Sequence, residues 1–133
     1  MIVDTSAVIA LIAGERSAPA IQRALRSGQR SRMAVATLTE TLIVAENKFE
    51  TSLRADAEAI LAAAQVEFVG MTDEDARSAA DAYARFGKGN HPARLNLGDC
   101  FAYALAKRTG EPLLCVGDDF ARTDIALVPL EAA

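Results

Sequence analysis

Short apolar segments alternate along this chain with longer stretches of helical periodicity. The segments at residues 2–3, 32–36, 66–69 and 113–116 have the composition of buried strands, and residues 125–128 are a candidate edge strand. Strands separated by helices pair side by side through crossover connections, which make neighbouring strands parallel. The sequence therefore predicts an α/β fold with a mostly parallel central sheet flanked by helices.

The stretches between these segments carry helix start and stop signals. Thr5 and Ser6 can cap the first helix, and glycines end the first, second and last helices. The Gly-rich stretch at residues 87–94 is the clearest loop. Since the chain has no repeats, low-complexity tracts or linkers, we expect a single domain over residues 1–133. The helices are predicted at residues 7–13, 18–27, 38–49, 53–64, 72–86 and 99–108.

The core must be built from small and aliphatic side chains. Apolar residues make up 51% of the 133 residues, whereas aromatic residues make up 5% and Trp is absent. Cys100 and Cys115 lie in apolar patterns without metal-ligand spacing, which predicts reduced core cysteines in a cytoplasmic protein. No apolar stretch approaches the roughly 20 residues that span a bilayer, and the first residues lack a signal-peptide pattern. We therefore expect no membrane contact.

The charge balance leaves the function open. The formal net charge is −4, which does not favour a protein that coats nucleic acid, because phosphate binding depends on Lys and Arg. An acidic balance does not exclude a nuclease, since a metal ion neutralises the acids of such a site.

Carboxylates stand at successive strand ends and helix starts. Asp4 directly follows the first strand, Glu40 and Asp99 lie in first turns of predicted helices, and Asp118 and Asp119 follow the strand at residues 113–116. In a parallel α/β sheet these positions gather along one edge. Acids that meet there need a cation to remain ionised, and Mg²⁺ is bound by carboxylates, waters and phosphate oxygens. The pattern predicts a metal-dependent phosphodiesterase.

Each acid also has a purely structural explanation. Asp4 can interact with the free N–H groups of the first helix. Thr37-x-x-Glu40 has the form of a capping box, and Asn96-x-x-Asp99 also places an acid in a first turn. Capping and metal binding are compatible, because an acid in a first turn is rigidly placed.

Four ordered segments resemble one family. They lie at residues 1–7, 36–40, 95–106 and 112–120, and they include Met1-Ile2-Val3-Asp4-Thr5-Ser6-Ala7 and Asn96-Leu97-Gly98-Asp99. Together they resemble the PIN-domain ribonucleases, and within them the VapC toxins of bacterial type II toxin–antitoxin pairs. The resemblance runs nearly from end to end of the chain.

The resemblance implies a toxic, metal-dependent endoribonuclease that hydrolyses RNA phosphodiester bonds. Its acidic core would be Asp4, Glu40 and Asp99, with Asp118 preferred to Asp119 as the fourth acid. Mg²⁺ or Mn²⁺ would be held by Asp4 and Asp99, while Glu40 and Asp118 hold metal-bound waters or a second ion. The resemblance also implies a PIN-domain sheet, a homodimer and inhibition by a cognate VapB-type antitoxin.

The substrate side is less distinct. Lys88 and Arg94, in the loop before Asp99, are candidates for contacts with RNA phosphates, although a basic loop is often simply solvated. His91 in the same loop has no partner at ligand spacing, and we expect it to be exposed. The alternative function is a non-catalytic PIN-like protein-binding module in which the acids serve only as caps. A doubly wound metal phosphatase is disfavoured because no Asp-x-Asp follows the first strand.

Overall fold

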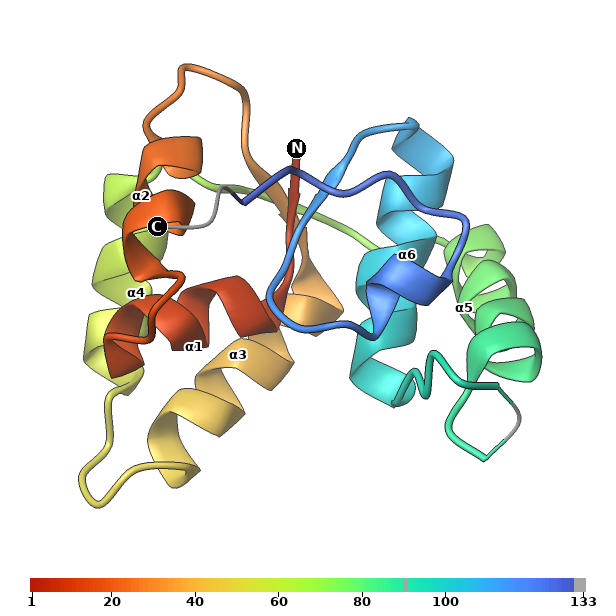
Figure 1. Ribbon diagram of the computed structural model, residues 1–133, viewed down its shortest axis with the longest axis horizontal. Helices are drawn as coiled ribbons and strands as arrows, with labels where there is room; N and C mark the ends of the chain where they lie inside the picture. The colour runs from red at the N-terminus through yellow and green to blue at the C-terminus, as the bar shows by residue number, and fades with distance from the viewer. Residues whose placement is uncertain (90, 131–133) are drawn as a thin grey trace.

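A four-stranded parallel sheet forms the centre of the molecule (Figure 1). A computed structural model describes residues 1–89 and 91–130. The strand order is β3-β2-β1-β4, every pairing is parallel, and β1 therefore lies between two neighbours. This arrangement confirms the predicted α/β class. The strands are β1 (Ile2–Val3), β2 (Arg32–Ala34), β3 (Glu67–Val69) and β4 (Leu113–Leu114).

The strands are shorter than the sequence predicted. Both β2 and β4 end two residues early, and residues 125–128 contribute only a single bridge, between Leu127 and Leu113. The segment after β2 turns at once into a helix, and the segment after β4 turns toward the acidic residues. After β4 the apolar run continues because Cys115 remains buried in the core, whereas Val35, which follows β2, begins a helix and is exposed.

Helices cover both faces of the sheet. In Figure 1 the helices α1 to α4 lie on one side and α5 and α6 on the other. No helix of the described residues is long and apolar enough to cross a membrane. The helices are α1 (Thr5–Ala13), α2 (Ala18–Leu25), α3 (Val35–Asn47), α4 (Arg54–Ala63), α5 (Asp73–Phe86) and α6 (Leu97–Thr109), followed by the 3₁₀ turn η1 (Phe120–Arg122).

Successive strand residues point into two separate apolar cores. Ile2 and Leu113 pack on the side of α5 and α6, whereas Val3 and Leu114 pack on the side of α1 to α4. All four side chains are almost completely buried, as the two-residue period of a strand with both faces covered requires. Cys100 and Cys115 are buried and free, as predicted.

Two predicted helix caps are wrong. The first helix begins at Thr5, and its cap is Asp4, whose side chain accepts from the N–H of Ser6. Helix α3 begins directly after β2, with Ala34 at the cap position and no side-chain cap. Thr37 therefore lies inside the helix, and the expected capping box with Glu40 does not form. Pairing of β2 decides where the chain leaves the sheet, and this tertiary constraint overrides the local cap signal. Helix α2 also ends at Leu25, before the predicted boundary.

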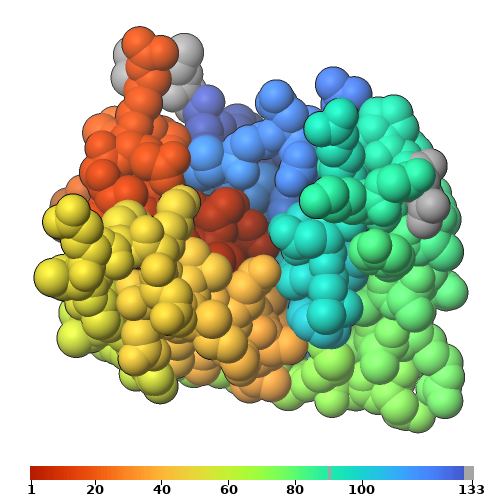
Figure 2. Space-filling view, turned by 90° about the horizontal axis from the view of Figure 1, so that it is seen from below, coloured from red at the N-terminus to blue at the C-terminus, as the bar shows by residue number. Residues whose placement is uncertain are grey.

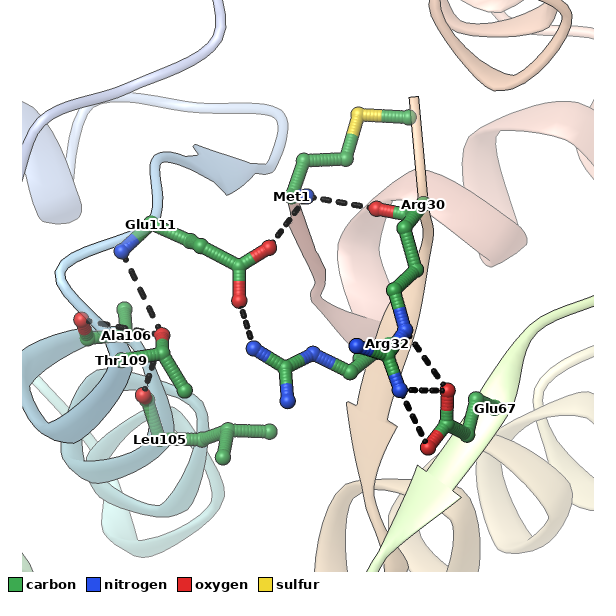
Figure 3. Close-up of polar contacts among 8 residues, drawn as sticks. All are labelled: Met1, Arg30, Arg32, Glu67, Leu105, Ala106, Thr109 and Glu111. Atoms are coloured by element: carbon green, nitrogen blue, oxygen red, sulfur yellow. Dashed lines mark hydrogen bonds and ion pairs between the residues drawn. The ribbon is translucent and has the colours of Figure 1, made fainter. Parts of the chain in front are cut away.

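The amino ends of the strands are joined by ion pairs (Figure 3). The Met1 ammonium group donates to the Glu111 carboxylate at 2.8 Å, and the Arg32 guanidinium donates to the other oxygen of Glu111. Arg30 forms an exposed pair with Glu67 beside them. Partial burial acts to raise the pKa of Glu111, but hydrogen bonds from Met1 and Arg32 hold it below its ordinary value. Glu111 thus connects β1, β2 and the segment before β4.

We expect Glu111→Gln to lower the free energy of unfolding at pH 7 by about 1–3 kcal/mol, since it leaves two cations without their acceptor. The depressed pKa means that this stabilisation is present above about pH 4.5 and is lost as the pH falls below it. Urea unfolding of a protein with a free Met1 amino group measures the change. Glu67→Gln is the matched control, because an exposed pair contributes less than about 1 kcal/mol. Equal losses in the two variants would contradict the assignment.

Candidate active site

Three of the predicted acids meet at the carboxyl edge of the sheet. Asp4 lies between β1 and α1, Glu40 in α3, and Asp99 in the first turn of α6. The charges of Asp4 and Glu40 both act on Asp99, so the three carboxylates are neighbours. In Figure 2 the dark red atoms at the start of α1 lie in a hollow bordered by α3, the beginning of α6 and the blue segment after β4.

Asp4 is a buried carboxylate with one oxygen free. Its backbone N–H donates to the Leu114 carbonyl at 3.0 Å, which holds the residue at the end of the sheet. Its Oδ2 accepts from the Ser6 N–H at 3.1 Å and from the Ser6 hydroxyl at 2.7 Å. Its Oδ1 is buried and has no hydrogen-bond partner among the described residues. Capping therefore accounts for only one of the two oxygens.

Ser6 connects Asp4 to the segment that follows β4. The Ser6 hydroxyl donates to Asp4 and accepts from the Val116 N–H at 2.9 Å. Val116 immediately precedes the turn that carries Asp118 and Asp119. One hydroxyl therefore ties the start of α1 to the segment that brings the fourth acid.

Glu40 is held by hydroxyl groups. Its Oε1 accepts from the Thr5 hydroxyl at 2.6 Å. The Thr5 and Thr41 hydroxyls lie 2.9 Å apart, and the Thr41 hydroxyl lies 2.8 Å from the Thr37 carbonyl oxygen. These contacts direct Glu40 toward α1, so its role is not the predicted cap of α3.

Asp99 does form a capping box. Its Oδ2 accepts from the Asn96 N–H at 3.1 Å, and its own N–H donates to the Asn96 side chain at 2.9 Å. The predicted structural role is confirmed, and it holds the carboxylate rigidly beside the other acids.

Burial and mutual repulsion oppose ionisation of this cluster. Burial raises the pKa of Asp4 to about 6; the Ser6 hydrogen bonds lower it, and the charge of Glu40 raises it. Burial also raises the pKa of Asp99 to about 7, with further contributions from the charges of Asp4, Glu40 and Asp119. Burial also raises the pKa of the neighbouring Cys115 thiol to about 12, and the charges of Asp4, Asp99 and Asp119 raise it further. The carboxyl edge of the sheet therefore carries several negative charges close together.

The two acids of the turn after β4 differ in their relation to the cluster. Both Asp118 and Asp119 are exposed. Asp119 stands at the start of η1, and its charge contributes to the raised pKa of Asp99. Asp119 is thus the acid of this turn whose charge acts on Asp99, while the assignment of Asp118 as the fourth acid stays a prediction.

The cluster suits a hard divalent cation. An unpartnered buried carboxylate oxygen and carboxylates that raise one another's pKa are the features that a bound cation would satisfy. Within residues 1–89 and 91–130, no three acidic, His or Cys side chains already stand together at metal-ligand spacing. Mg²⁺ is compatible with this arrangement, because it takes one or two carboxylates and keeps several waters. Asp4 and Asp99 are the residues that fit it.

The loop before α6 is only partly as predicted. Lys88 and Arg94 are exposed and form no ion pair within the described part of the chain, and Asn90 lies outside the described residues. His91 is partly buried instead of exposed, since its Nδ1 accepts from the Ala93 N–H at 3.0 Å and its ring packs edge-on against Phe86. This contact was not predictable from ligand spacing.

Two features of the site were missed in the sequence. Thr37 and Thr41 are spaced four residues apart, so they share a helix face, which is a signal for a joint role. Gly98 lies inside the first turn of α6, where a helix-weakening residue indicates a packing or functional reason.

Comparisons with known proteins agree with this fold. The PIN domain family model matches residues 1–126. Ribonuclease VapC42 of Mycobacterium tuberculosis is 41% identical over 126 residues, which cover 94% of this chain and 96% of that protein. The solved structure of VapC20 of M. tuberculosis, a sarcin–ricin loop cleaving toxin, matches with a TM-score of 0.76 at 21% identity and covers 96% of this chain and 97% of its own. A toxin–antitoxin complex from Klebsiella pneumoniae matches with a TM-score of 0.69 at 17% identity over 98% of both chains. The chain belongs to the PIN domain family, and within it to the VapC ribonucleases.

We expect the metal-free protein to lose stability as the pH rises from 5 to 8. Asp4 and Asp99 bind protons more tightly in the folded than in the unfolded chain, so ionisation of their carboxyls above their folded pKa values opposes folding. The expected decrease in the free energy of unfolding is on the order of 2 kcal/mol. Chemical unfolding in the presence of EDTA at the two pH values measures it.

Asp99→Asn should flatten this pH dependence, whereas Asp118→Asn should leave it unchanged. Excess Mg²⁺ should restore stability at pH 8, because a cation competes with protons for the same carboxylates. An unchanged pH dependence in Asp99→Asn would contradict the electrostatic account.

Proposed function

We propose that this chain is a toxic, metal-dependent endoribonuclease whose activity resides in the carboxylate cluster at the carboxyl edge of the sheet. The observation that carries the proposal is the buried, unpartnered Oδ1 of Asp4 beside the charges of Glu40 and Asp99. The relative VapC42 is named a ribonuclease, which supports cleavage of RNA as the reaction.

Each acid receives a role from its surroundings. Asp4 and Asp99 would hold Mg²⁺ or Mn²⁺, and the cation would supply a water of lowered pKa and polarise the phosphate. Glu40, half-buried and held by the Thr5 hydroxyl, orients the attacking water and accepts its proton. Ser6 keeps Asp4 in place through a hydrogen bond to one oxygen, and the other oxygen remains free for the cation.

Asp119 takes the place of Asp118 as the fourth acid. Its charge acts on Asp99, and the link from Ser6 to Val116 holds the turn beside the site. Lys88 and Arg94 remain the proposed contacts to RNA phosphates, since both are exposed in the loop that leads to α6.

A cognate VapB-type antitoxin is the proposed inhibitor, supported by the toxin–antitoxin complex from K. pneumoniae that shares this fold. A homodimer is proposed from exposed apolar side chains next to the site. These are Val35 and Ile43 on α3 and Leu97 at the start of α6, with exposed fractions of 41, 56 and 67%. The two free cysteines support a cytoplasmic location.

The alternative of a non-catalytic binding module has less support. In that case the acids need only cap helices, which suits Asp99 and one oxygen of Asp4. Glu40 caps no helix, and its carboxylate, held by Thr5, adds a negative charge beside Asp4 and Asp99. Such repulsion has no use in a module that binds no cation.

We expect Asp4→Asn and Asp99→Asn to reduce Mg²⁺-dependent RNA cleavage by at least about a hundredfold, because each removes a ligand charge. Cleavage of a structured RNA by the purified protein measures this effect. Induced expression should arrest growth with the wild type but not with Asp99→Asn. Both variants should remain folded, since they relieve repulsion. Cleavage at the wild-type rate by folded Asp99→Asn would overturn the nuclease assignment.

The two acids of the turn form a matched pair for a second test. Asp119→Asn should lower the cleavage rate by about tenfold or more, as for residues that hold metal-bound water. Asp118→Asn should change it by less than about twofold, because that exposed side chain acts outside the cluster. The ratio of the two rates under identical Mg²⁺ is the measurement, and the reverse order would restore Asp118 as the fourth acid.

A further inference from the structure

Gly98 occupies a helical position at which glycine has no conformational advantage. It lies between Leu97 and Asp99 in the first turn of α6, and its φ is outside the left-handed region. Glycine weakens a helix relative to alanine. A reason for glycine here must therefore come from what surrounds it.

The carboxylate of Glu40 occupies the space that a side chain at Gly98 would fill. A Cβ placed on Gly98 would overlap both Oε atoms and the Cδ of Glu40. The three heavy atoms nearest to such a Cβ all belong to the end of this one flexible side chain. Helix α6 thus presents bare backbone to Glu40, and any larger residue would displace the carboxylate.

Thr5 contacts the same carboxylate from α1. Its hydroxyl donates to Oε1 of Glu40 at 2.6 Å, and Thr5 itself is only 8% exposed. Thr41, which is fully buried, lies against that hydroxyl and limits its rotation. The Glu40 side chain therefore has a hydrogen-bond donor on one helix and a backbone surface on another.

We propose that Gly98 and Thr5 are positioning residues that together fix the carboxylate of Glu40 beside Asp4 and Asp99. This inference deepens the proposed function and rests on it for its catalytic meaning. The positioning itself is a property of the protein without substrate. It predicts that a methyl group at Gly98 moves the Glu40 side chain without destabilising the fold.

Gly98→Ala should therefore lower the affinity for Mn²⁺ without lowering the stability of the protein. Helix stability should be unchanged or increased, since alanine is the better helix former and Glu40 can turn aside. The affinity for Mn²⁺, measured by calorimetry without RNA, should fall about tenfold, as is typical when a supporting residue of a metal site is lost. RNA cleavage should fall with it. Gly70→Ala is the matched control, because a Cβ at Gly70 meets nothing within 4 Å.

A double-mutant cycle with Glu40→Ala tests whether Gly98 acts through Glu40. In the Glu40→Ala background the added methyl has nothing to displace, so Gly98→Ala should change Mn²⁺ affinity by less than about twofold. Thr5→Val should lower the affinity in the wild-type background, while Thr5→Ser, which keeps the hydroxyl, should retain it. In the metal-free protein, NMR side-chain couplings of Glu40 should report one rotamer, and that rotamer should be lost in Gly98→Ala.

Several results would overturn the proposal. An equal loss of Mn²⁺ affinity in both backgrounds would mean that Gly98 acts on something other than Glu40. A lowered unfolding midpoint in Gly98→Ala would identify a packing role between α3 and α6. Unchanged Glu40 couplings in Gly98→Ala would refute the positioning directly, even for a protein that binds no Mn²⁺. Wild-type protein that cleaves no RNA would instead contradict the proposed function, while the couplings would still report on Gly98.

Discussion

Burial of the Asp4 carboxylate at the end of a central strand is the constraint on which the rest of the site depends. Strand β1 lies between β2 and β4, so the residue that follows it leaves the sheet at its middle, between two apolar cores. A charge in this position is unfavourable unless it is hydrogen-bonded or paired. Ser6 satisfies one oxygen, and the other remains for a cation. Glu40 of α3 and Asp99 of α6 then place two more negative charges beside Asp4.

Charges are paired at the amino edge of the sheet, whereas like charges are clustered at the carboxyl edge. At the amino edge, Glu111 lies between two cations and Arg30 pairs with Glu67, so every drawn charge has a partner (Figure 3). At the carboxyl edge, burial raises the pKa values of Asp4 and Asp99, and neighbouring negative charges raise them further. The paired edge stabilises the fold, whereas the unpaired edge opposes it. Such a division is expected where a functional site stores repulsion that a ligand relieves.

Local sequence signals succeeded where local contacts decide the structure. The Asn96–Asp99 capping box and the glycine after α1 are formed by residues within a few positions of each other, and both were predictable. The Thr37–Glu40 box failed although its local pattern was equally good. Pairing of β2 with β3 sets the end of the strand at Ala34, which moves Thr37 into the helix and frees Glu40 to reach α1.

The sequence by itself determined the order of strands and helices along the chain and the parallel class of the sheet. It also determined which acids lie at the carboxyl edge of that sheet. These follow from short-range periodicity and from the geometry of crossover connections. Only the tertiary structure decided that Glu40 lies against Thr5 and the bare backbone of Gly98, and that the charge of Asp119 acts on Asp99. Such contacts join segments far apart in the chain, and their geometry depends on how helices pack on the sheet. No local pattern of residues carries that information.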